Sequence, residues 1–398
     1  MSFSLRARPA STAAMVAAFD DDSLLRGALA FEAALASGQA EEGLIPVDQA
    51  AAIDAACTAL SLDPGGLAEA AAHAGTLAIP LVERLRTAVA VTHPSAAAAV
   101  HRGATSQDLA DTALMLQAKG ALDLLRSDLD RLEKALAALI DQHAETLMLG
   151  RTLLQSALPM TFGLKVASWA VGIRNARERL QREADGALML QLGGAAGTLV
   201  GMGTSETAMA VICRVARRLH LGVPVLPWHA RRDGVAGLAA ALAILTGAVG
   251  KIAKDIALLA QSEVAEAFEP RVVGRGGSSA MAHKRNPTGC QVALSAALRT
   301  PGLASTLLAG LPQEHERGLG GWQAEGPVLA DLFLLTHGAV AAMADVTEGL
   351  EVDTAAMARN LTKAGVGTDP GATKLLIQAA RDALTQWPIR RTEQNPAA

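Results

Sequence analysis

The sequence has no tyrosine, and aromatic residues occupy only 3% of its 398 positions. The absence of tyrosine excludes one of the side chains that can serve as a catalytic acid. Hydrophobic residues nevertheless make up 51% of the chain, with alanine and leucine in place of the aromatics. This composition favours helices that pack closely through small side chains.

Cysteine is scarce, and no sign of charge predominates. Cys57, Cys213 and Cys290 are odd in number and form no CxxC motif, which argues against a disulfide framework or a zinc site and fits a reducing cytoplasm. The N-terminal 22 residues contain arginines but no long apolar core, so we predict no cleaved signal and a cytoplasmic location. A net charge of −4 predicts no general affinity for nucleic acid or a membrane surface.

Long hydrophobic runs are also few. One uncharged run, residues 234–250, approaches the length of a membrane span. It is rich in alanine and glycine and continues without a break into the segment KIAKDIALLAQSEV. We therefore interpret it as a helix buried in a bundle, and we expect no membrane partner.

Helical periodicity is the main pattern that is present. Residues 22–60 predict two helices joined by a Gly-Leu-Ile-Pro turn, and LEVDTAAMARNL predicts the start of another helix near the end. Longer periodic segments begin near residues 112, 160, 234 and 288, and several exceed 25 residues without internal stops. Such lengths are typical of a bundle completed by other subunits. No strand-like alternation is present, so we predict an all-α fold.

Four polar clusters interrupt the apolar pattern, each at a predicted helix end: residues 101–112, 150–159, 274–290 and 314–325. Each alone has an ordinary structural explanation. The segment TSQD is typical of a helix N-cap, Arg151 of a surface ion pair, and the glycine-rich cationic loop of a solvated linker. Their joint occurrence favours a functional site.

Together the clusters resemble the fumarase/aspartase superfamily, which includes adenylosuccinate lyase and argininosuccinate lyase. Residues 277–287 match the signature G-S-S-x-M-P-x-K-x-N-P except that Ala282 replaces the proline. Residues 105–108 resemble its T-S-x-D region, residues 151–155 its R-T-x-x-Q region, and the similarity extends over residues 20–360. The resemblance implies a three-segment fold with an N-terminal helical domain (1–110), a long central helix bundle (111–345) and a short C-terminal helical domain (346–398). It also implies a homotetramer whose active sites combine clusters from three subunits.

Two departures from the superfamily indicate the reaction. Relatives that expel water or an amine carry a histidine in R-T-H-x-Q and a supporting glutamate after the signature loop, whereas this chain has Leu153 and Gln291. Leucine cannot transfer a proton, and a carboxylate leaving group, with a pKa near 4, needs no proton donor. The chemistry that fits is reversible addition of a carboxylate to a conjugated double bond within one molecule.

The motifs are especially similar to the family of bacterial 3-carboxy-cis,cis-muconate cycloisomerases. The resemblance implies interconversion of 3-carboxy-cis,cis-muconate and 4-carboxymuconolactone, in the protocatechuate branch of the β-ketoadipate pathway, without a metal or other cofactor. It makes Ser278 the general base or acid at the carbon next to a carboxylate, with Lys284 and His283 stabilising its alkoxide beside a helix N-terminus near Asn286. The expected substrate-binding residues are His101, Thr105, Ser106, Gln107, Arg151, Thr152, Gln155, Asn286 and Arg317.

Three alternatives stay open at this point. The same chemistry could act on another 3-substituted muconate, such as 3-sulfomuconate. A superfamily lyase acting on a succinyl-type adduct is disfavoured by Leu153 and Gln291. A non-catalytic helical assembly that keeps the scaffold is disfavoured because Ser278, Lys284 and Asn286 are all present.

Overall fold

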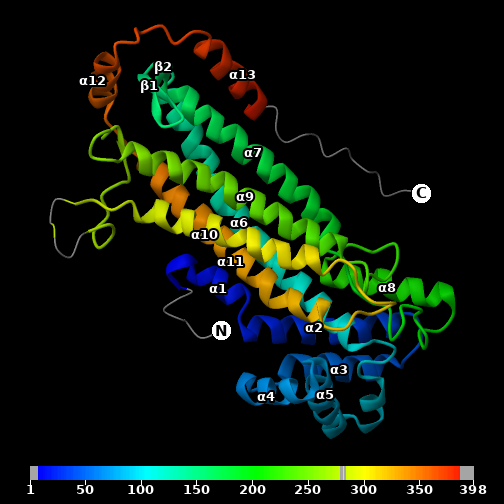
Figure 1. The fold of residues 1–398 in the computed structure, drawn as a ribbon. Coiled ribbons are helices and arrows are strands. Elements are labelled where there is room, and N and C mark those ends of the chain that lie inside the picture. The colour runs from blue at the N-terminus through cyan, green and yellow to red at the C-terminus, as the bar shows by residue number, and fades with distance from the viewer. Residues whose placement is uncertain (1–7, 278–280, 282–283, 386–398) are drawn as a thin grey trace.

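A computed structural model describes residues 8–277, 281 and 284–385 of the chain. Helices make up most of this part, and the predicted all-α fold is confirmed. The molecule is elongated, with a bundle of long helices in the middle and shorter helices at both ends (Figure 1).

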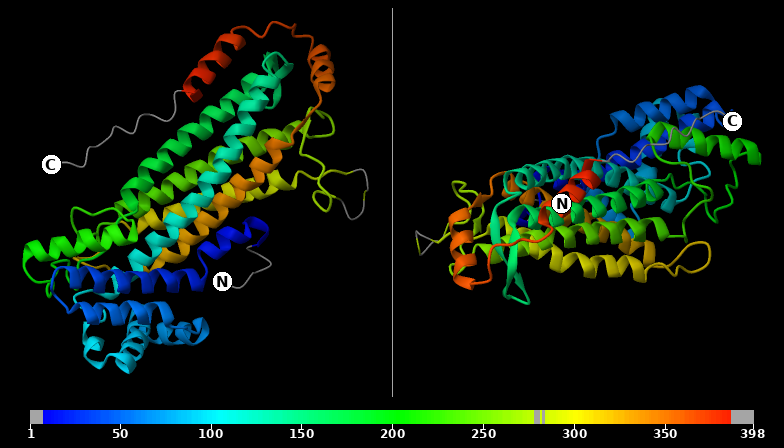
Figure 2. Two further views of the ribbon diagram at one scale, coloured as in Figure 1. Left: turned by 180° about the vertical axis from the view of Figure 1, so that it is seen from behind. Right: turned by 90° about the horizontal axis from the view of Figure 1, so that it is seen from above.

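The N-terminal part consists of helices that mostly lie beside one end of the bundle (Figures 1 and 2). They are η1 (Arg8–Ala10), α1 (Ala13–Ala18), α2 (Asp21–Glu41), α3 (Val47–Ala59), α4 (Pro64–Ala74), α5 (Ala78–Thr92) and η2 (Pro94–Ala99). Helix α2 begins after Asp20, whose Oδ1 accepts a 2.8 Å hydrogen bond from the Ser23 N–H, and α3 begins after Pro46. The two helices predicted for residues 22–60, and the turn between them, are confirmed.

The bundle is built from five long helices that run lengthwise beside one another (Figures 1 and 2). They are α6 (Ser106–Gln142), α7 (Phe162–Ala187), α9 (Asp233–Leu259), α10 (Thr288–Ala309) and α11 (Gly321–Glu348), and α8 (Ser205–Leu219) lies beside one end. Small residues allow close approach: a Cβ added at Gly250 of α9 would come within 2.7 Å of the Ala297 Cβ on α10. The abundance of alanine and glycine is therefore a packing feature of the bundle.

Two small sheets were not predicted. Strands β1 (Leu147–Thr152) and β2 (Gln155–Thr161) form an antiparallel hairpin, and β3 (Ala267–Phe268) pairs with β4 (Glu351–Val352). The prediction of no strands is wrong for these segments because they are too short and too irregular to alternate. Beyond them, α12 (Thr354–Ala364) begins after Asp353 as predicted, and α13 (Thr373–Thr385) follows. The expected segment boundaries at residues 110 and 345 lie inside α6 and α11.

Within the described residues, three helices are long and apolar enough to cross a membrane when judged by length and composition alone: α9, α10 and α11. In α9 and α11, 61% and 72% of the most hydrophobic window is buried within the chain itself. This agrees with the interpretation of residues 234–250 as a bundle helix. In α10 only 28% is buried, and Leu298 is 85% exposed, so α10 presents an apolar face that its own chain leaves uncovered.

Candidate active-site residues at the two ends of the bundle

The helices hold the predicted site residues at two separate places. Thr105 immediately precedes α6 and Arg151 follows it; the 37 residues of α6 rise by about 55 Å. Likewise Asn286 precedes α10 and Arg317 follows it, and the 22 residues of α10 rise by about 33 Å. We call the two places the threonine end, with His101, Thr105, Ser106, Gln107 and Arg317, and the hairpin end, with Arg151, Thr152, Gln155, Lys284 and Asn286.

At the threonine end, two predicted clusters meet although they lie far apart in the sequence. Arg317 Nη1 donates a 2.5 Å hydrogen bond to Thr105 Oγ1. The Thr105 N–H donates to Asp108 Oδ2 at 2.9 Å, which caps the start of α6. The structure thus confirms the N-cap reading of TSQD and also places a guanidinium against that cap, with Ser106 as the first residue of α6.

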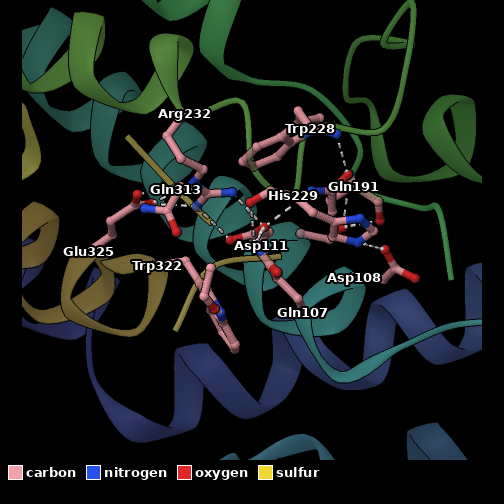
Figure 3. A network of polar contacts seen from close by, with 12 residues as sticks. Gln107, Asp108, Asp111, Gln191, Trp228, His229, Arg232, Gln313, Trp322 and Glu325 are labelled. Atoms are coloured by element: carbon pink, nitrogen blue, oxygen red, sulfur yellow. Dashed lines mark hydrogen bonds and ion pairs between the residues drawn. The ribbon is translucent and has the colours of Figure 1, made fainter. Parts of the chain in front are cut away.

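Asp108 organises this end, although the sequence analysis did not select it as a site residue. It is fully buried and accepts hydrogen bonds from the N–H groups of Gly193 (3.0 Å) and Gly194 (2.9 Å). His229 Nε2 lies 2.7 Å from its Oδ1 (Figure 3). Gly194 has φ +70°, and an added Cβ would meet the Gly103 carbonyl oxygen at 2.8 Å, so only glycine fits. These contacts fix the chain that leads into Thr105.

His101 is fixed by a buried carboxylate. Its Nδ1 lies 2.5 Å from Oε1 of Glu32 on α2, and Glu32 is only 1% exposed. Glu32 Oε2 has no hydrogen-bond partner among the described residues. The contact orients the ring and leaves Nε2 as the nitrogen available to another group. Glu32 was missed because nothing in the helical sequence around it marks a functional position.

Beside Asp108 lies a buried ion-pair network (Figure 3). Arg232, 1% exposed, donates to both carboxylate oxygens of Asp111 at 2.8 Å and, through Nε, to Glu325 Oε1 at 3.0 Å. Burial raises the pKa of the Glu325 carboxyl. For Arg232 burial acts against the charge, but the two carboxylates outweigh it and raise its pKa. The network joins the starts of α9 and α11 to the first turns of α6.

Gln107 belongs to this network. Its Nε2 donates to Asp111 Oδ2 at 3.1 Å and to the His229 carbonyl oxygen at 2.9 Å, and the residue is fully buried. In the structure its amide nitrogen therefore donates hydrogen bonds to buried groups of the threonine end. Glu325 comes from the fourth predicted cluster, whereas the stretch HARRDG, which supplies His229 and Arg232, was not recognised.

At the hairpin end, Arg151 is paired within its own chain. It donates to both oxygens of Glu266, at 2.9 and 2.7 Å, and Glu266 is fully buried. Asn360 of α12 donates to the same carboxylate at 2.7 Å. Nearby, burial lowers the pKa of Lys165, against the opposing effect of Asp255. Glu266 was missed because it lies 115 residues from Arg151 in an unremarkable stretch.

The hairpin closes with an unusual two-residue turn. Thr152 and Gln155 pair across the strands, both are exposed, and Leu153 and Leu154 form the turn between them. Both leucines have positive φ values, +51° and +64°, and are 91% and 83% exposed. The left-handed conformation costs a residue with a Cβ roughly 1–2 kcal/mol. The tip of the hairpin is thus both strained and apolar.

The described parts of the signature loop form a narrow stem. Gly277 pairs with Arg285, and the Asn286 N–H donates to the Gly276 carbonyl oxygen at 2.8 Å. The carboxylate of Glu269 accepts from the N–H groups of Gly289 and Cys290, so it caps α10, which begins at Thr288, close to Asn286 as expected. Ser278 and His283 lie outside the described residues.

A cavity of about 290 Å³ adjoins this stem. Its lining includes Lys284 and Asn286 together with three arginines, Arg271, Arg275 and Arg285. Lys284 is exposed, and Arg285 is partly neutralised by Glu351 at 3.0 Å. The cavity gathers donors that suit anionic oxygens. No group of three or more metal-ligating side chains occurs within residues 8–277, 281 and 284–385; the absence of a metal or other cofactor stays a prediction.

Comparison with known proteins identifies the family. A family model described as a lyase matches residues 8–302. The chain belongs to this lyase family of the fumarase/aspartase superfamily. It is 51% identical to 3-carboxy-cis,cis-muconate cycloisomerase of Bradyrhizobium diazoefficiens over 88% of this chain and 77% of that protein. It is 41% identical to nitrosuccinate lyase of Streptomyces davaonensis over 88% and 75% of the two chains.

Comparison with a solved structure indicates the same family. The crystal structure of 3-carboxy-cis,cis-muconate lactonizing enzyme from Pseudomonas putida superimposes with a TM-score of 0.85 at 43% identity. The match covers 96% of this chain and 88% of that one. The three-segment superfamily fold expected from the motifs is confirmed.

Proposed function

We propose that this protein is a cycloisomerase that interconverts 3-carboxy-cis,cis-muconate and 4-carboxymuconolactone. The observation that carries the proposal is the hairpin tip, where the motif that holds a histidine in water- and amine-eliminating relatives has Leu153, whose side chain cannot donate a proton. A carboxylate needs no such donor to add or depart. The relatives named as muconate cycloisomerases support the same reaction.

In the forward direction, one carboxylate oxygen forms a bond to the conjugated carbon, and the displaced electron pair moves into an aci-carboxylate at the other end. Ser278 then delivers a proton to the α carbon, which restores the carboxylate. Thr105, Arg317, Lys284 and Asn286 supply the hydrogen-bond donors around the anionic oxygens. Since nucleophile and electrophile belong to one molecule, positioning accounts for much of the rate.

We further propose that the active site is assembled from several copies in a homotetramer. The six-carbon chain of 3-carboxy-cis,cis-muconate is less than about 10 Å long, so this tricarboxylate cannot reach from the threonine end to the hairpin end of one chain. Only 28% of the most hydrophobic window of α10 is buried within its own chain, and its exposed apolar face is the surface that other copies would cover. We also propose that the protein is cytoplasmic and has no nucleic-acid or membrane partner.

The test of the reaction is a spectrophotometric substrate panel. Purified protein is incubated with 3-carboxy-cis,cis-muconate, 3-sulfomuconate and unsubstituted cis,cis-muconate, and loss of the diene absorbance is followed. Adenylosuccinate, argininosuccinate and fumarate are assayed in parallel. We expect turnover of the 3-carboxy compound above all others. No absorbance change with any muconate would contradict the proposal, and preference for the sulfonate would redefine the substrate.

Assembly is tested by mixing two inactive variants. Ser278→Ala removes the proton carrier and Arg317→Ala removes a donor of the threonine end, so each alone has low activity. If a site takes the two residues from different chains, unfolding and refolding the variants together restores a fraction of sites that contain both native residues. Activity that stays at the level of the separate variants would show that the two residues do not combine across chains.

A further inference from the structure

The tip of the β1–β2 hairpin combines two features that are unfavourable within its own chain. A two-residue turn with positive φ at both positions suits Asn-Gly, because asparagine and glycine tolerate the left-handed conformation. Leu153 and Leu154 adopt it instead, and both are almost fully exposed. Neither burial nor turn preference explains these leucines, so we looked for a partner outside the chain.

The hairpin is held rigidly enough to present this tip in a fixed place. At its base Met148 is fully buried and Leu149 is 4% exposed. A Cβ at Gly150 would come within 2.7 Å of the Leu158 carbonyl oxygen, so the strands approach closely just before the tip. Arg151 is clamped by Glu266. The strained turn therefore sits on a stiff support.

Two expected substrate-binding residues flank the tip. Thr152 and Gln155, which flank the two leucines, belong to the predicted binding residues, and their pairing fixes which way the turn projects. The threonine end, which carries Arg317 and Thr105, lies at the opposite end of the same bundle. A complete site thus needs the hairpin tip of one copy at the threonine end of another.

We propose that Leu153 and Leu154 form an apolar wall that contacts the ring-closing carboxylate of the substrate in a neighbouring copy's active site and excludes water from it. This inference rests on the proposed function. A carboxylate in water is strongly hydrated, and its oxygen must lose that hydration before it bonds to carbon. The polar residues around the other carboxylates hold the substrate, while the leucine wall leaves the attacking oxygen without hydrogen-bond donors. The strained turn is retained because it directs both leucine side chains toward that carboxylate.

The experiment replaces the tip by the turn sequence that the backbone prefers. In the full-length protein, Leu153→Asn combined with Leu154→Gly keeps the hairpin and removes the wall. We expect kcat for 3-carboxy-cis,cis-muconate to fall at least about tenfold, as for lost apolar contacts at a reacting group. KM should change less than about threefold, because the wall acts on the transition state. The unfolding midpoint should stay equal or rise, since strain is relieved.

Two matched variants separate the wall from other effects. Leu153→Met with Leu154→Met keeps an apolar tip, and we expect its kcat to stay within about threefold of wild type. Leu375→Asn makes the same polar change at a leucine of α13 that is 71% exposed, and kcat should not change. Mass photometry establishes the oligomeric state of each protein.

The inference is overturned if the Asn-Gly variant keeps the wild-type kcat, or if the methionine variant loses as much as the Asn-Gly variant. It is also overturned if the Asn-Gly variant loses activity only because the assembly dissociates, which would make the tip an interface contact. Wild-type protein that converts no muconate would instead contradict the proposed function itself.

Discussion

The two ends of the bundle treat their functional side chains in opposite ways. At the threonine end the charged groups are buried and matched: Asp108, Asp111 and Arg232 are at most 2% exposed, and each has several partners in its own chain. At the hairpin end the base is clamped, but Lys284 and the leucine tip face outward. The threonine end is organised by contacts within the chain, whereas the hairpin end presents exposed groups.

The difference has a physical reason. A buried ion pair is stable only if every charge is compensated, so the threonine end must be complete in each folded chain. Exposed groups at the hairpin end carry no such penalty before assembly. In the proposed assembly, a substrate and a second copy would surround the apolar and strained tip. Substitutions at the threonine end should therefore mainly lower stability, whereas substitutions at the hairpin end should mainly lower turnover.

The largest effect is expected from the loss of the proposed proton carrier. Ser278→Ala should lower turnover by about 10²–10⁴-fold, the range typical of a removed proton carrier, while substrate still binds. The unfolding midpoint should not change, because the substitution removes only one hydroxyl group. Turnover is measured by loss of diene absorbance, and binding by calorimetry. Near-normal turnover would remove Ser278 from the mechanism.

At the threonine end the main signature should be stability. Arg232→Gln leaves Asp111 and Glu325 buried without a cation, and we expect it to lower the free energy of unfolding by about 3–5 kcal/mol. The control is Arg231→Gln next door, where the arginine is 57% exposed and pairs with an exposed aspartate. That change should cost less than about 1 kcal/mol. Urea unfolding curves compare the two, and equal losses would contradict the central role of the buried network.

A smaller effect is expected from breaking the ion pair between Glu266 and Arg151, which holds the base of the hairpin. Glu266→Gln removes the charge that holds Arg151 and should cost about 1–3 kcal/mol of stability, as for a hydrogen bond to a charged group. Because the strands are less constrained, kcat should fall more than KM rises. The control, Glu263→Gln, changes an exposed glutamate of the same segment. If Glu266→Gln behaves like this control, the clamp does not position the hairpin.

Much of the fold was predictable because helical periodicity and the residues at helix ends can be recognised in the local sequence. The periodic spacing and the turn at Pro46 located α2 and α3, and Asp353 marked the start of α12. The hairpin was not predictable, because β1 and β2 depend on each other across a turn whose two leucines give no turn signal. Likewise, Thr105 and Arg317 were selected from motifs, but Glu32 and Glu266 were not, because a single acidic residue looks ordinary in the sequence until its partner is known.

By itself, the sequence determined the helical class, the superfamily and, through Leu153 and Gln291, the kind of leaving group that the site can serve, because these depend on residue identity. Only the tertiary structure decided which charges are buried and paired, that the predicted residues lie at opposite ends of helices about 33–55 Å long, and that the hairpin tip is strained. These properties depend on distances in the folded chain. Contacts between residues 100 or more positions apart do not change the local sequence pattern of either segment.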